Sequence, residues 1–300
     1  MRNLSENFGL CPPLVETTSH GSRVTNHQYR SLVYLLVMGV FLTSASTPRS
    51  WGRYSGGTGE PNDPYRIATP QDLNDIGNHP EDFNKCFLMV ANINLANYTG
   101  TQFNIIAPDT DNGQPLFQGT PFTGTFDGNG HIVSNFTYTS TGTDYIALFG
   151  YVASPGEIKN LGMVDVNVDA GTGYYVGGLV GLNDYGIVSN CYATGSVSGS
   201  SIVGGLVGYD YFGTVTASFW DIDTSGQAIS AGGTGKTTVQ MQTQSTFTDA
   251  GWDFVEIWGI GENQTYPYLR VYPAGDLNHD SRVDFLDFVI FANHWLAGVE

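Results

Sequence analysis

The chain has 300 residues, of which 39 are glycine, while aromatic and charged residues each make up 13%. This aromatic content excludes an intrinsically disordered chain, because disorder requires few aromatics and dense charge. A formal net charge of −17 repels phosphate backbones and argues against nucleic acid as a partner, whereas it attracts divalent cations.

The N-terminus has the order of a secretory signal. Arg23 and Arg30 precede an apolar run, residues 32–42 (LVYLLVMGVFL), and small residues follow it. The run is shorter than the roughly 20 residues that a membrane span needs. We therefore expect residues 1–46 to be a signal peptide and the mature protein to be secreted or cell-surface, with no membrane span. A membrane anchor is the alternative interpretation.

A short helix and strands are predicted next. In residues 69–72 (TPQD), Thr69 can cap a helix and Pro70 suits its first turn, so a helix is expected to end near Gly77. Residues 87–95 (FLMVANINL) are typical of a strand. We interpret residues 47–121 as an N-terminal cap and the first coils.

Two sequence markers then repeat with a shared period. The first, ALFG or GLVG, contains Leu148, Leu179 and Leu206, which are 31 and 27 residues apart. The second occurs at 133–136 (VSNF), 158–161 (IKNL), 188–191 (VSNC) and 215–218 (VTAS). A period near 27 with short apolar strands and several glycines fits one coil of a solenoid.

The predicted fold is therefore all-β, a right-handed parallel β-helix with a small C-terminal calcium loop and helix. Repeats occupy 122–220 and a closing region occupies 221–273. Equivalent residues of stacked coils form ladders, so the three leucines should point inward, one over another. Asn135, Asn160 and Asn190 either form a hydrogen-bonded ladder at a corner or serve as solvent-exposed turn residues.

Part of this repeat resembles a known family. Residues 175–181 (YVGGLVG), followed by 187–195 (IVSNCYATG), resemble the GLUG repeat of large exported bacterial proteins, some of which are surface adhesins. Residues 126–131 (FDGNGH) are similar to the opening coil of such β-helices. The resemblance covers about 122–220 and implies the fold, but no single function.

Residues 274–300 contain a predicted calcium loop. Oxygen-bearing side chains occupy positions 1, 3, 5, 9 and 12 of a twelve-residue loop, and position 7 offers a main-chain carbonyl, a spacing that wraps oxygen ligands around one Ca²⁺. Carboxylates this close repel one another without a cation, so metal binding and local folding should be coupled. An acidic tail that binds nothing is the alternative. The predicted ligands are Asp276, Asn278, Asp280, Arg282, Asp284 and Asp287.

A helix with an apolar face is predicted to follow the loop. Asp287 at the last loop position, the single exit helix and the preceding Gly275 resemble a dockerin type I repeat, a single EF-hand-like unit. That family implies binding to a cohesin-like module on a scaffold or the cell surface. Ser281 replaces the usual turn glycine, which should weaken calcium binding, and only one repeat is present. The apolar positions are Phe285, Phe288, Val289, Ala292 and Trp295.

No catalytic motif stands out. The phosphate-loop look-alike at 232–237 (GGTGKT) has Ser230 where the motif needs glycine. Asp221 and Asp223 resemble a hydrolase acid pair, but we interpret them as solvated turn residues. We favour a non-catalytic module for adhesion or for carbohydrate or protein binding, with a polysaccharide-degrading enzyme of a cellulosome-like system as the alternative. Aromatic candidates for stacking on sugars, or for sheet packing, are Tyr174, Tyr175, Tyr192, Tyr209 and Tyr211.

The cysteines carry no metal or redox spacing. Cys11 lies in the predicted signal peptide, which leaves Cys86 and Cys191. We favour two small buried core residues over a disulfide between them.

Overall fold

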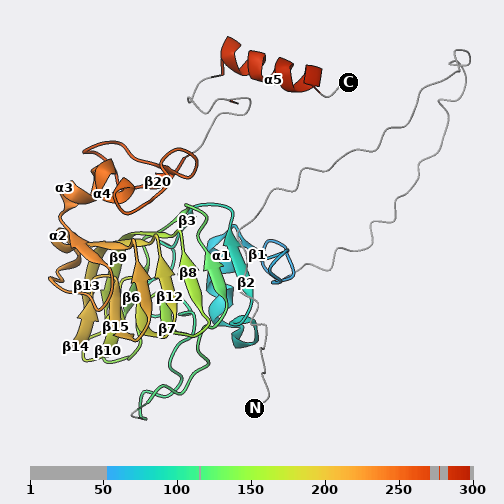
Figure 1. Cartoon of the computed structure of the whole chain (residues 1–300). Helices are drawn as coiled ribbons and strands as arrows, with labels where there is room; N and C mark the ends of the chain where they lie inside the picture. Colours follow the sequence, from blue (N-terminus) through green and yellow to red (C-terminus); the bar gives the residue numbers. More distant parts are fainter. Residues whose placement is uncertain (1–52, 115, 271–276, 278–282, 298–300) are drawn as a thin grey trace, which may run out of the picture.

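The computed structural model describes residues 53–114, 116–270, 277 and 283–297. They form a parallel β-helix in which short strands of successive coils lie side by side (Figure 1), so the predicted all-β architecture is confirmed. The predicted signal peptide lies outside the described residues.

Parallel sheets form the walls of the β-helix. The first sheet pairs, in order, β1 (Tyr65–Ile67), β2 (Cys86–Met89), β4 (Thr125–Asp127), β8 (Glu157–Lys159), β12 (Ile187–Ser189) and β16 (Thr214–Thr216). The second pairs β3 (Ile93–Asn94), β5 (Ile132–Ser134), β9 (Gly162–Asp169), β13 (Tyr192–Ser198), β17 (Phe219–Asp221) and β18 (Thr234–Lys236), with β6 (Thr137–Thr139) also beside β9.

The third sheet pairs β7 (Phe149–Ala153), β11 (Val180–Asp184) and β15 (Val207–Tyr211), and the fourth pairs β10 (Tyr174–Gly177) with β14 (Ser201–Gly204). An antiparallel pair, β19 (Trp258–Gly259) and β20 (Tyr268–Leu269), follows the coils. The helices are α1 (Pro70–Gly77), the 3₁₀ helix η1 (Pro80–Asp82), α2 (Ile222–Ser225), α3 (Thr238–Met241), α4 (Gln244–Thr248) and α5 (Phe285–Ala297).

The N-terminal helix forms as predicted, but the following strand is divided. The Thr69 hydroxyl accepts a hydrogen bond from the Asp72 amide at 3.0 Å, and the Asp72 carboxylate accepts one from the Thr69 amide at 3.0 Å, a capping box. The prediction of one strand over 87–95 is wrong, because β2 and β3 belong to different sheets. The chain turns a corner between them.

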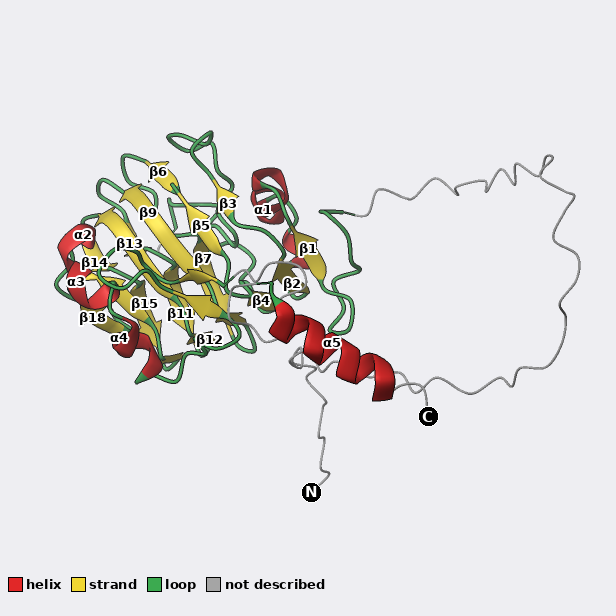
Figure 2. Ribbon diagram, turned by 90° about the horizontal axis from the view of Figure 1, so that it is seen from above, coloured by secondary structure: helices red, strands yellow, loops and turns green. Residues whose placement is uncertain are grey.

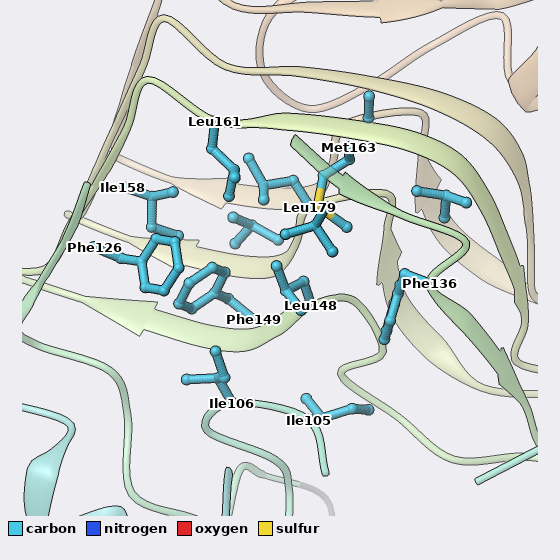
Figure 3. Packing of buried hydrophobic residues seen from close by; sticks show 14 of the residues in the cluster. Ile105, Ile106, Phe126, Phe136, Leu148, Phe149, Ile158, Leu161, Met163 and Leu179 are labelled. Carbon is cyan, nitrogen blue, oxygen red and sulfur yellow. The ribbon is translucent and has the colours of Figure 1, made fainter. Parts of the chain in front are cut away.

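The leucine ladder predicted from the first marker is confirmed. Phe149 and Val180 are paired across neighbouring coils, which places Leu148 beside Leu179, and the Leu179 amide donates to the Leu206 carbonyl at 3.0 Å. All three leucines are fully buried. Figure 3 shows Leu148 and Leu179 together inside the coils. Like side chains therefore stack to make the core.

The second marker is confirmed except for its first copy. Ile158, Val188 and Val215 are paired in the first sheet. Val133, however, pairs with Met163 in the second sheet, and Phe126 is the residue beside Ile158. The reason is a longer corner. Between the aligned positions 127 and 132 the first coil advances five residues, whereas the next advances three between 159 and 162.

The asparagine ladder forms in part. The Asn190 amide nitrogen Nδ2 donates to Asn160 Oδ1 at 3.3 Å, and Asn160 Nδ2 donates to Asp127 Oδ1 at 3.1 Å. Both asparagines have positive φ, at 51° and 53°, a conformation that asparagine tolerates better than most residues. Asn135 belongs to another row, where it donates to Asn94 Oδ1 at 3.0 Å. Hydrogen bonding between coils is confirmed, and membership of Asn135 in the same ladder is wrong.

Residues beyond the coils cover the outer face of the second sheet with a second hydrophobic cluster. Tyr192, which points outward from β13, is fully buried beneath Phe247 and Trp252, and its hydroxyl donates to the Pro267 carbonyl at 2.6 Å. Tyr192 therefore cannot stack on a sugar, and of the two roles considered for it, packing on the sheet is the one that the structure shows.

Cys86 and Cys191 do not bridge each other. Cys191 is a free, fully buried thiol, and burial raises its pKa to about 12, so the predicted core role is confirmed. Cys86 is disulfide-bonded, which corrects the expectation of a reduced core residue. Among the described residues, no helix is long and apolar enough to cross a membrane.

Candidate functional site

Strands β7, β11 and β15 lie side by side in one wall of the coils (Figure 2), and we call their outward face the outer wall. It carries a row of partly or fully exposed side chains. Tyr151, Leu182 and Tyr209 are paired in register on the three strands, and none of them is buried. Because side chains alternate along a strand, the next residues, Val152 and Asn183, face inward, and both are fully buried. The outer wall thus presents one apolar side chain per coil.

Aromatic rings continue this row from coil to coil. We call Tyr145, Tyr151, Tyr175 and Tyr209 the tyrosine row. The Tyr145 and Tyr175 rings stack with centroids 4.7 Å apart, and the Tyr175 and Tyr209 centroids are 5.8 Å apart. Phe117 closes one end, 4.4 Å from Tyr151. Tyr145 is 6% exposed and Tyr209 39%, so the row opens toward the last coil.

The glycine that ends each GLVG marker allows the coils to come this close. A Cβ on Gly181 would lie 2.6 Å from the Gly150 carbonyl oxygen and 2.7 Å from the Tyr175 carbonyl oxygen. Gly208 is equally crowded by Gly181 and Val176. The glycines therefore permit close backbone approach next to the tyrosine row.

A second aromatic group, the Tyr185 cluster, is formed by Tyr185, Tyr211 and Phe212. The Tyr185 and Phe212 rings stack at 5.5 Å, and Tyr211 and Phe212 meet edge-on at 4.7 Å. Their exposed fractions are 54%, 46% and 69%. Large apolar side chains clustered on a surface indicate a binding site.

The sequence pointed to Tyr209 and Tyr211 but not to Tyr185 and Phe212. A signal was present, because both missed residues directly precede a glycine at the equivalent turn of successive coils, 183–186 (NDYG) and 210–213 (DYFG). Both have positive φ, at 54° and 52°.

A carboxylate links the two aromatic groups. The Tyr151 hydroxyl donates to Asp184 Oδ2 at 2.6 Å, and Asp184 is followed in the chain by Tyr185. Burial, then this bond, raises the pKa of Tyr151, so the phenol stays a hydrogen-bond donor at neutral pH. Asp184 forms no ion pair with any described lysine or arginine.

A second carboxylate lies behind the same edge. Asn183 is fully buried, and its Nδ2 donates to Asp210 Oδ1 at 2.7 Å and to the Gly186 carbonyl at 3.3 Å. Its Oδ1 accepts no hydrogen bond from any residue that the structure describes. Burial raises the pKa of Asp210, and the bond from Asn183 opposes the shift only in part.

This shift predicts how Asp210→Asn changes stability with pH. A folded-state pKa above the unfolded value stabilises the fold at low pH, and that stability is lost as pH rises through the folded pKa. Asparagine keeps the acceptor for Asn183 and removes the buried charge. We expect Asp210→Asn to unfold at a higher temperature than the wild type at about pH 7, with a smaller gain at about pH 3. A gain that grows toward low pH would contradict this explanation.

The acid pair considered for hydrolysis has a structural role. Asp221 is fully buried, caps α2 through the Asp223 and Thr224 amides, and accepts the Tyr266 hydroxyl at 2.7 Å. Asp223 accepts from the Thr238 amide at 2.8 Å. The interpretation of Asp221 as a solvated turn residue is wrong, because its carboxylate connects the coils to the closing region.

The predicted calcium loop falls mostly outside the described residues. Asp287 is 2% exposed, and its carboxylate accepts the Leu277 amide at 2.6 Å and the Asp284 amide at 2.8 Å. The last predicted ligand thus folds back against the loop, and an all-oxygen donor set suits a hard cation. The described residues hold no cluster of three or more histidine, cysteine or acidic side chains, so calcium binding stays a prediction. Asp276, Asn278, Asp280 and Arg282 are not among the described residues.

The predicted exit helix is confirmed as α5, from Phe285 to Ala297. Its apolar side chains are largely exposed, with Phe285 at 74%, Phe288 at 60% and Trp295 at 67%.

Comparison with known proteins finds the GLUG motif at residues 172–198, which confirms that part of the resemblance. The matched residues include β10, which contains Tyr175, and the three strands that follow it, β11, β12 and β13. "Halomucin" of Haloquadratum walsbyi is 33% identical over 153 residues, 49% of this chain and 2% of that protein. A "Putative Gly-rich membrane protein" of Evansella cellulosilytica is 48% identical over 119 residues, 36% of this chain and 14% of that protein. This chain therefore spans a small part of either relative.

Among solved structures, a crystal structure described as "a putative immunoglobulin A1 protease from Bacteroides ovatus" is 15% identical, with a TM-score of 0.37. The match covers 73% of this chain and 96% of that one.

Proposed function

We propose that this chain is a non-catalytic extracellular module that binds carbohydrate through the outer wall. The observation that carries the proposal is a pair of aromatic groups on adjoining positions of stacked coils: the tyrosine row, which is exposed at Tyr209, and the exposed Tyr185 cluster. Tyrosine offers a flat apolar face together with a polar hydroxyl, a combination suited to sugar rings with their apolar faces and hydroxyl edges. The predicted export signal and the names of the two relatives support a location outside the cell or at its surface.

The architecture favours binding because the site is already ordered. The rings are held by stacking on one another, and the strands beneath them are fixed by main-chain pairing between coils. A ligand then pays less for ordering side chains and loops than it would on a mobile surface.

A glycan array probed with the purified chain, with and without EDTA, tests the proposal. The outer wall contains no predicted metal ligand, so we expect carbohydrate binding in both conditions. Absence of binding to every glycan in both conditions would overturn the proposal.

We further propose that the C-terminal loop binds one Ca²⁺ and supplies a separate attachment to a cohesin-like module or cell-surface scaffold, as the dockerin resemblance implies. Support comes from the oxygen-rich spacing and from the buried Asp287 carboxylate. In calorimetry of the intact chain we expect one calcium site, lost when Asp276→Ala and Asp280→Ala are combined, because the loop then lacks two of its carboxylates. Equal calcium heats for the wild type and the variant would contradict this assignment.

A further inference from the structure

We infer that the outer wall prefers linear polysaccharides that carry amino groups and discriminates against uronic-acid and other anionic polymers. The inference rests on the proposed function and names the class of carbohydrate for the same site.

The charges around the outer wall have one sign. Strands β7, β11 and β15 contain Asp184 and Asp210 and no lysine or arginine. Lys159 is the only lysine or arginine between positions 86 and 235, and it lies in the first sheet, where it pairs with Glu157 at 3.0 Å. No described cation therefore neutralises the two carboxylates of the outer wall.

The carboxylate and the tyrosine rings of the outer wall both favour binding of an ammonium group. The Asp184 carboxylate lies where the tyrosine row meets the Tyr185 cluster, and it is partly exposed. Tyrosine faces also attract cations through the ring quadrupole. A uronate carboxylate placed on the same surface meets like charge, and the net charge of −17 adds long-range repulsion.

The direction of the row favours a linear chain. Tyr151, Leu182 and Tyr209 succeed one another across paired strands, so the row runs along the stacking axis of the coils. Phe117 closes the end at Tyr151, and the opposite end at Tyr209 is exposed. A polymer laid along this axis passes Asp184, which projects from the middle strand.

Three hexasaccharides of different charge test the inference: the hexamers of glucosamine, of N-acetylglucosamine and of galacturonic acid. Titration of the intact chain at low salt, below the pKa of the sugar amine, should show tightest binding to the glucosamine hexamer. We expect about two- to five-fold weaker binding to the N-acetylglucosamine hexamer, the range given by one partly exposed charge pair. The galacturonic acid hexamer should bind weakest, and added salt should reduce the differences.

Asp184→Asn removes the central charge with little change of shape, so the ratio between the amine and acetylated hexamers should fall toward one. Asp169→Asn, at an exposed position at the end of β9 in the second sheet, is the matched control and should keep the wild-type ratio. A wild-type ratio of one, or galacturonic acid bound as tightly as the acetylated hexamer, would overturn the preference while the carbohydrate-binding proposal stands. Failure to bind any hexamer or any array glycan would overturn both.

Discussion

Replacing Leu179 with alanine is expected to lower the free energy of unfolding by about 2–5 kcal/mol. Leu179 is fully buried between Leu148 of the preceding coil and Leu206 of the next. Truncation leaves a cavity that touches both neighbours, and main-chain pairing on either side prevents the coils from collapsing to fill it. Denaturant unfolding of the purified chain measures the change.

The matched control is Leu116→Ala, since Leu116 is 71% exposed in the loop before β4. It should change stability by no more than about 0.5 kcal/mol. If the two variants were equally stable, the ladder would not be the core of the fold.

Gly181→Ala should also be strongly destabilising, by about 3 kcal/mol or more, although it adds one carbon. The new Cβ would meet two carbonyl oxygens, of Gly150 and Tyr175, at 2.6 and 2.7 Å. These are main-chain atoms, which cannot rotate away as a side chain can, so the coils must separate. Because Tyr175 belongs to the tyrosine row, carbohydrate binding should weaken together with stability.

Gly226→Ala separates crowding from backbone strain. Gly226 has a φ of 69°, and no atom lies within 4 Å of the position that an added methyl group would take. Alanine at this position should lower the free energy of unfolding only by the cost of holding a non-glycine residue in the left-handed conformation, about 1–2 kcal/mol. Thermal melts compare the two variants. A larger loss for Gly226→Ala than for Gly181→Ala would argue against close coil packing at the GLVG marker.

The spacing of the repeated marker was sufficient to predict the core. Coils of similar length stack, so residues about one period apart in the sequence come into contact. Leu148, Leu179 and Leu206 keep their place in each coil, and their ladder is the one expected. The misplacement of Val133 shows the limit of the method. An added pair of residues in one corner moves a marker to another sheet, and a period count cannot detect it.

The candidate site was harder to predict because it depends on contacts between coils and on what covers each face. The bond from Tyr151 to Asp184 joins residues 33 positions apart. Tyr192 has the same chemistry as Tyr209, yet one is buried and the other exposed, because the second hydrophobic cluster, which includes Phe247, covers Tyr192 on the second sheet. Tertiary packing decides which of the two tyrosines is buried, and the local sequence around each tyrosine does not reveal it.

Calorimetric titration of a bound array glycan into the wild type, Tyr209→Ala and Tyr268→Ala tests the role of the outer wall most directly. Tyr209 and Tyr268 are 39% and 41% exposed, but Tyr268 lies in β20, which is not a strand of the outer wall. We expect Tyr209→Ala to weaken binding about ten-fold or more, the loss of an aromatic binding residue, and Tyr268→Ala to bind as the wild type does. Wild-type affinity in Tyr209→Ala, or an equal loss in both variants, would contradict carbohydrate binding at the outer wall.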